Sequence, residues 1–181
     1  MQREEALDLV KGRLKNKNLV KHCLAVEACM RKMAQEFGEN QDLWGLAGLL
    51  HDLDYEETKN DFSQHGFVTA KILKERGINE EVIEAIKSHP GHIERKTKMA
   101  KALYAVDPLT GLIVASALMH PEKKLEALNV QFVLNRFKEK SFARGANREQ
   151  IKSCRELELS LEKFIDISLK AMREIHKELE L

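Results

Sequence analysis

The chain has 181 residues, of which 43% are hydrophobic, so it can bury the core of one domain, or of one domain with an extension. Its 30 basic and 29 acidic residues leave a net charge of +1, which excludes a general electrostatic attraction to nucleic acid or to an anionic membrane. No apolar run approaches about 18 residues and the N-terminus reads as a charged amphipathic helix, so we expect neither a membrane span nor a signal peptide.

Apolar residues recur at helical spacing along nearly the whole chain, and runs of alternating β-branched residues are missing. We therefore predict an all-α fold. Gly38 is placed to end one helix, Asn79 to cap another, and Pro90–Gly91 to stop it. The predicted helices span residues 2–15, 18–37, 41–51, 63–76, 80–89, 97–106, 108–119, 122–128, 130–138, 147–153 and 155–179.

The character of the sequence changes near residue 140, where the polar connection "SFARGANREQIKSC" leads into a long helix. We predict one compact unit in two parts: a helical domain over residues 1–140 and a helical extension over 141–181 that packs on it. The extension carries an apolar stripe, which packs back on the domain or forms the seam of a homodimer. The stripe consists of Leu157, Leu161, Phe164, Ser168, Met172, Ile175 and Leu179.

The three cysteines are Cys23, Cys29 and Cys154. An odd number without close pairing argues against a disulfide framework. We expect reduced thiols and a cytoplasmic protein.

The stretch "WGLAGLLHDLDYEE", residues 44–57, is an apolar helix that ends in His51 and Asp52. A helix that is apolar on nearly all sides lies centrally in a fold, and an ionised Asp there is costly unless it is paired or binds a cation. This pair is the strongest single indication of a metal. The alternative is an exposed polar helix end, which Asp54, Glu56 and Glu57 would suit.

Three further histidines, His22, His65 and His89, lie on the apolar faces of their predicted helices. Taken alone, His22 fits better as a core histidine bonded to the backbone. Asp107 also falls on an inner face, although with Pro108 next to it an ordinary helix N-cap is the simpler interpretation. Burying so many imidazoles and carboxylates without partners would cost several kcal/mol each. We therefore predict one or two divalent transition-metal ions (Fe, Mn, Zn or Ni), which suit imidazole and carboxylate ligands.

The ordered set H…HD…H…H…D on a helical chain resembles the HD-domain superfamily of metal-dependent phosphohydrolases. The histidines in "QHG" and "KSHPGH" resemble those of the subgroup with a six-ligand, two-metal site. "LYAVDPLTGLIVASALM" and "SFARGANREQIKSC" are similar to small bacterial HDIG-type proteins, so the resemblance covers roughly residues 18–175. Leu53 and Asp54 stand where the HDIG subgroup has Ile-Gly.

The resemblance implies an HD-domain-like helical bundle that hydrolyses a phosphate ester through a metal-activated water. It implies a first ion held by His22, His51, Asp52 and Asp107. Asp52 would bridge to a second ion bound by His65 and His89, and would also orient the attacking water. Asp54 is a candidate general acid/base or a carboxylate that supports the ligands, with a solvent-facing acid as the alternative.

The basic run "HIERKTKMAK" follows His89, and within it His92, Arg95 and Lys96 are candidates to bind phosphate. A solvated helix face is the alternative. No aromatic ladder accompanies the run, since the chain has one Trp and two Tyr. We therefore predict a small phosphorylated molecule or nucleotide as the substrate, and no extended nucleic acid.

The ligand pattern leaves two other functions open. HD-fold mixed-valent di-iron oxygenases resemble this chain in the same six positions, so the ligands alone do not separate an oxygenase from a hydrolase. A metal-stabilised regulatory or binding domain without turnover is the third interpretation.

Overall fold

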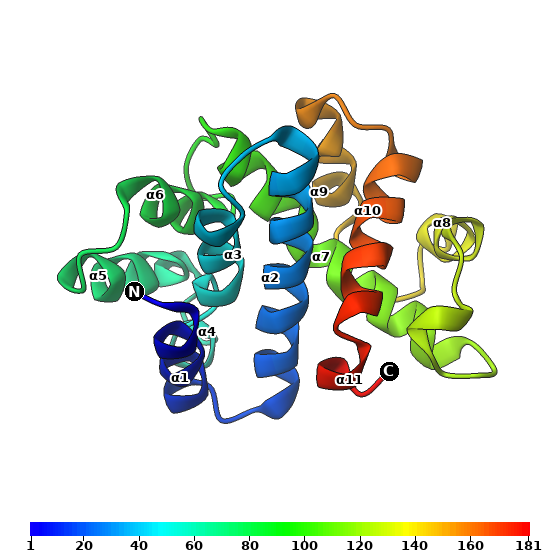
Figure 1. Cartoon of the computed structure of the whole chain (residues 1–181), viewed down its shortest axis with the longest axis horizontal. Coiled ribbons are helices and arrows are strands. Elements are labelled where there is room, and N and C mark those ends of the chain that lie inside the picture. The colour runs from blue at the N-terminus through cyan, green and yellow to red at the C-terminus, as the bar shows by residue number, and fades with distance from the viewer.

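The computed structural model describes residues 1–181, and all of its regular structure is helical (Figure 1), which confirms the predicted all-α class. The α-helices are α1 (Arg3–Arg13), α2 (Lys17–Phe37), α3 (Gln41–Leu50), α4 (Tyr55–Thr58), α5 (Phe67–Glu75), α6 (Glu80–Ser88), α7 (Lys98–Met119), α8 (Val130–Lys138), α9 (Arg148–Lys152), α10 (Leu161–Glu174) and α11 (His176–Leu179). Three short 3-10 helices are η1 (Phe62–Gln64), η2 (Leu125–Ala127) and η3 (Ser153–Leu157).

The long helix α2 runs through the middle of the molecule, with α3 on one side and α10 on the other (Figure 1). Asn16 caps its start by accepting the Asn18 N–H, and Gly38 ends it with φ of +69°, as the sequence predicts. α7 packs against α2 as well, and α6 and α9 pack on α7. Residues of every α-helix except α4 contribute to one hydrophobic core.

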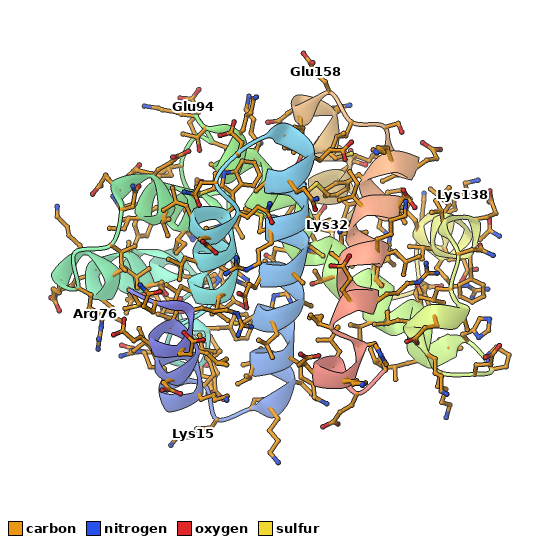
Figure 2. The ribbon with its side chains drawn as sticks, viewed as in Figure 1. Lys15, Lys32, Arg76, Glu94, Lys138 and Glu158 are labelled. Carbon is orange, nitrogen blue, oxygen red and sulfur yellow. The ribbon has the colours of Figure 1, made fainter.

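Charged side chains cover the outside of this bundle. Arg76, Glu94 and Lys138, for example, project from its periphery (Figure 2). α10 turns its apolar side toward α2, α7 and α8, so the stripe on the C-terminal extension is covered within the chain itself.

The predicted helix break at Asp107–Pro108 is wrong, because α7 continues through both residues. Proline has no N–H, so the Tyr104 carbonyl four residues earlier loses its helical donor. The side-chain amide of Gln150, on α9, donates to that carbonyl at 2.9 Å instead. Asp107 is therefore an interior helical residue and not an N-cap.

Three other predicted helices differ from the structure. The segment 63–76 begins as η1, and Gly66 with φ of +80° separates His65 from α5. The segment 122–128 contains only η2, and the long helix 155–179 is interrupted after Glu158, whose φ is +60°. Ser160 then caps α10 by accepting the Lys163 N–H.

By length and composition alone, α7 is apolar enough to cross a membrane. A helix at the centre of a fold meets the same criterion, and 56% of the most apolar stretch of α7 is buried inside this protein. The absence of a membrane span stays a prediction.

Candidate metal centre

His51 is positioned by a close contact between α3 and α2. A Cβ on Gly48 would lie 2.8 Å from the Val26 carbonyl oxygen, so glycine is what allows α3 to approach α2 so closely. The His51 side chain, just after α3, is fully buried, and its Nδ1–H donates to the Gly48 carbonyl at 2.8 Å. Its Nε2 atom is buried without a hydrogen-bond partner. A buried nitrogen of this kind is costly, so its lone pair marks a place for a cation.

His65 is positioned by the carboxylate of Asp54. That carboxylate accepts the Nδ1–H of His65 at 2.8 Å and the backbone N–H groups of Gly66 and Thr69 at 2.9 and 2.8 Å. Gly66 has a positive φ, and a Cβ there would lie 2.8 Å from the Ile86 carbonyl oxygen. Glycine therefore permits both the turn after His65 and its contact with the end of α6.

His89 and His22 are held in the same manner by acceptors on their Nδ1 atoms. His89 follows the last residue of α6 and its Nδ1–H donates to the Ile86 carbonyl at 2.6 Å. On α2, the His22 Nδ1 lies 3.1 Å from the hydroxyl oxygen of Thr110. That hydroxyl donates its own hydrogen to the Asp107 carbonyl at 2.8 Å, so it accepts from His22.

The four histidines thus share one tautomer, with hydrogen on Nδ1 and a lone pair on Nε2. All four Nε2 atoms face the carboxylate of Asp52. The shortest distances from Nε2 to an Asp52 oxygen are 3.6 Å for His22, 3.4 Å for His51, 3.2 Å for His65 and 3.5 Å for His89. Asp107 completes the group, with Oδ1 lying 3.1 Å from the His22 Nε2 and 3.9 Å from the His51 Nε2.

These donors fit a divalent cation. Two atoms that bind one ion at about 2.1 Å and at right angles lie about 3 Å apart. Two sets of donors lie within 4.8 Å of one another, namely His22–His51–Asp107 and His51–Asp52–His89. In addition, the Nε2 atoms of His65 and His89 are 3.1 Å apart, a separation that two bare lone pairs tolerate only with a proton or a metal ion between them.

The charge states agree with a site built for cations. Burial lowers the pKa of His51 to about 4, so its imidazole is neutral at pH 7. Burial also lowers the pKa of His65, but hydrogen bonds to Asp52 and Asp54 outweigh it and raise that pKa to about 9. Burial raises the pKa of Asp52, yet the histidines around it bring that pKa well below its ordinary value. Without metal, the site therefore carries a proton on His65 that a cation must displace.

The site opens into a cavity of about 550 Å³. Five of the six predicted ligands line this cavity, while His51 is buried behind them. The rest of the wall combines aromatic rings with amide and apolar side chains and contains no Lys or Arg. It is formed by Leu19, Tyr55, Phe62, Pro90, Tyr104, Pro108, Gly145, Asn147 and Gln150.

Asp54 is not the solvent-facing acid that the sequence left open, because its carboxylate is fully buried. Nor does it reach the cavity, and its two oxygens are occupied by three N–H donors. The acid/base role of Asp54 stays a prediction, and this geometry gives it no support. Asp54 instead fixes the tautomer and the direction of His65.

The predicted phosphate-binding residues His92, Arg95 and Lys96 do not line the cavity either. The His92 Nε2 lies 2.9 Å from the Phe62 carbonyl oxygen. Arg95 stacks on Tyr104, with its guanidinium 3.9 Å from the ring centroid and 3.1 Å from Glu156. Lys96 is exposed.

Sequence reasoning also missed residues that complete the site. Thr110 follows Asp107 by three residues, a spacing that could have indicated its contact with the same site. Asn147 and Gln150 gave no signal of this kind, because they reach the cavity only through the packing of α9 on α7.

Fold and site together define an all-α protein with a buried centre of four histidines and two aspartates that can hold divalent metal. The sequence model of the HD domain matches residues 19–141, and the chain belongs to this family, a superfamily of metal-dependent phosphohydrolases whose domains bind divalent metals.

Several curated relatives carry the name ribonuclease Y. The protein of Fusobacterium nucleatum is 30% identical over 148 residues, which are 76% of this chain and 29% of the relative. That of Enterococcus faecalis is 29% identical over 184 residues, covering 96% of this chain and 35% of the relative. That of Sulfurovum sp. is 34% identical over 112 residues, which cover 59% of this chain and 22% of the relative. The chain thus spans about a third or less of the length of these relatives.

Proposed function

We propose that this protein is an enzyme that hydrolyses a phosphate ester in a small phosphorylated molecule or nucleotide. The observation that carries the proposal is the set of four imidazoles that direct their Nε2 lone pairs at one buried carboxylate. A cation bound by these histidines, Asp52 and Asp107 would supply an acidified water and positive charge for the phosphate oxygens. Fe, Mn, Zn and Ni all suit this donor set, with one or two ions bound.

The side chains of the chain itself prepare the site. The Nδ1 acceptors keep each imidazole in the tautomer that leaves Nε2 bare. Tyr55, Phe62 and Tyr104 line the cavity in front of the ligands. Since no Lys or Arg lines the cavity, the ions alone balance the charge of the reacting group, which favours a substrate with a single phosphate there.

A phosphodiester bond in RNA is the second candidate substrate. Its support is the name of the relatives, together with their identity of about 30% to this chain. The net charge of +1 and the neutral wall favour a nucleotide or the end of a strand over an extended nucleic acid. We also propose a cytoplasmic location, supported by three buried free cysteines.

The test begins with elemental analysis of the purified protein. The metal-loaded protein is then assayed with p-nitrophenyl phosphate, bis(p-nitrophenyl) phosphate and a labelled RNA oligonucleotide. We expect turnover that is lost in His51→Ala and Asp52→Ala and retained in His176→Ala, whose side chain pairs with Glu126 at the surface. Full metal content in Asp52→Ala would contradict the site.

The same preparation separates the other two interpretations. Paired iron with an oxygen-dependent spectral change, and no ester hydrolysis, would favour an oxygenase. Tightly bound metal with neither activity would favour a binding or regulatory domain.

A further inference from the structure

Part of the cavity wall lies beyond residues 19–141, the segment that the HD domain family shares with this chain. Gly145, Asn147 and Gln150 form this part of the wall. They belong to the turn before α9 and to α9 itself, which packs on α7 next to the ligand Asp107. The metal ligands are thus those of the family, whereas this wall is supplied by a separate segment.

The segment is held in place by Arg148. The five N–H groups of its guanidinium are shared among six backbone carbonyls at the end of α8 and in the following turn, at 2.5–3.5 Å. These carbonyls belong to Arg136, Phe137, Glu139, Phe142, Ala143 and Ala146. Asn147 caps α9 by accepting the backbone N–H groups of Glu149 and Gln150. The segment that carries this part of the wall is therefore tied to α8 and the following turn by hydrogen bonds of Arg148, and its helix is capped by Asn147.

Gln150 is the side chain through which this segment reaches the site. One N–H of its amide is used by the Tyr104 carbonyl that Pro108 leaves without a helical donor. Its carbonyl oxygen and its second N–H have no hydrogen-bond partner within the protein, and the residue lines the same cavity as Tyr104. An aromatic side chain and an amide with a free donor and a free acceptor in one cavity suit a flat, uncharged, hydrogen-bonding group.

We propose that Gln150 is a specificity-determining residue that recognises an uncharged heterocycle, such as a nucleobase, attached to the reacting phosphate. The inference rests on the proposed function, since it places a phosphate at the ligands. The neutral wall selects against a second phosphate or another anion in the position of the heterocycle.

The test is a binding measurement and requires no turnover. The metal-loaded protein is titrated calorimetrically with two phosphonates, in which a P–C bond replaces the scissile P–O bond: the phosphonate analogue of adenosine 5′-monophosphate, and methylphosphonate. Gln150→Met keeps the length of the side chain but removes its hydrogen bonds. Gln131→Met is the matched control, since the exposed Gln131 amide reaches only Asn135 on α8. Metal content and the unfolding midpoint are recorded for each variant.

We expect the wild type to prefer the adenosine phosphonate. Gln150→Met should raise the Kd of that phosphonate about tenfold, the size of one hydrogen bond, and change the Kd of methylphosphonate less than twofold. Gln131→Met should change neither. The inference is overturned if Gln150→Met leaves both Kd values unchanged, or raises both equally, which would show an action through Tyr104 and α7. A wild type without preference between the two phosphonates also overturns it.

The two proposals fail on different measurements. A protein that binds the adenosine phosphonate through Gln150 but hydrolyses no phosphate ester would retain the inference and refute the hydrolase. If the protein hydrolyses a phosphate ester but Gln150→Met has no effect on binding, the hydrolase is retained and the role of Gln150 is refuted.

Discussion

Replacement of Asp54 by Asn tests how the second ion is held. Asp54 touches no predicted ligand except His65, so its effect on metal can arise only through that imidazole or through the backbone around it. An asparagine whose Oδ1 takes the position of the Asp54 Oδ2 still accepts the N–H groups of Gly66 and Thr69. Its NH₂ group then faces the His65 Nδ1, which must give up its hydrogen and accept.

The consequence is a change of tautomer. The His65 hydrogen moves to Nε2, where it donates to the Asp52 Oδ1 3.2 Å away and blocks the lone pair. Loss of one charge-assisted hydrogen bond in favour of a neutral one lowers the free energy of unfolding by about 1–2 kcal/mol. The affinity for the ion bound by His65 and His89 should fall about 10–100-fold, while the ion bound by His22 and Asp107 stays.

Calorimetric titration of the metal-free protein with Mn²⁺, together with urea unfolding, measures both effects. Glu57→Gln is the matched control, since it removes an exposed carboxylate that pairs with Arg13 at 2.7 Å and should cost less than about 1 kcal/mol. Asp54→Ala leaves three buried donors unpaired, so it should lower the free energy of unfolding by at least about 3 kcal/mol. If Asp54→Asn bound the full complement of ions with wild-type affinity, the tautomer argument would be refuted.

Three further predictions concern stability. The unfolding free energy of the metal-free protein should be greatest near pH 6.5. The pKa of His65 is raised to about 9 in the fold, which adds up to about 3 kcal/mol of stability that is lost as pH rises from 6.5 to 9. The pKa of His51 is lowered to about 4, so a similar amount of stability is lost as pH falls from 6.5 to 4. A flat urea-unfolding profile from pH 5 to 9 would contradict this. Arg148→Met should lower the unfolding midpoint measurably while metal content is unchanged, because the guanidinium holds six carbonyls outside the ligand set; a wild-type midpoint would show that these bonds add nothing. Chelation should lower the midpoint of the wild type and leave that of Asp52→Ala unchanged, as differential scanning calorimetry can show.

The side chains that meet in this centre could be named from the sequence because few residue types bind a divalent cation. An imidazole or carboxylate on an apolar helical face is rare enough to be noticed, and His22, His51 and His89 lie on, or directly after, helices whose periodicity places them correctly. His65 was placed on a helix face, but it lies before α5, in a turn that depends on Gly66. Its inward direction comes from Asp54, an acid that the sequence cannot distinguish from the surface acids around it.

Pro108 shows most clearly why the continuity of α7 and the cavity wall could not be predicted from the sequence. A proline after an aspartate indicates a helix start when only local chemistry is considered, because it removes a hydrogen bond that an interior helix needs. In the fold, Gln150 supplies that hydrogen bond to the Tyr104 carbonyl from 46 positions further along the chain, so α7 continues and Asp107 faces the site. The compensating donor is also a wall residue of the cavity. The continuity of a core helix and the shape of the substrate space therefore depend on one tertiary contact, and no local pattern in the sequence contains it.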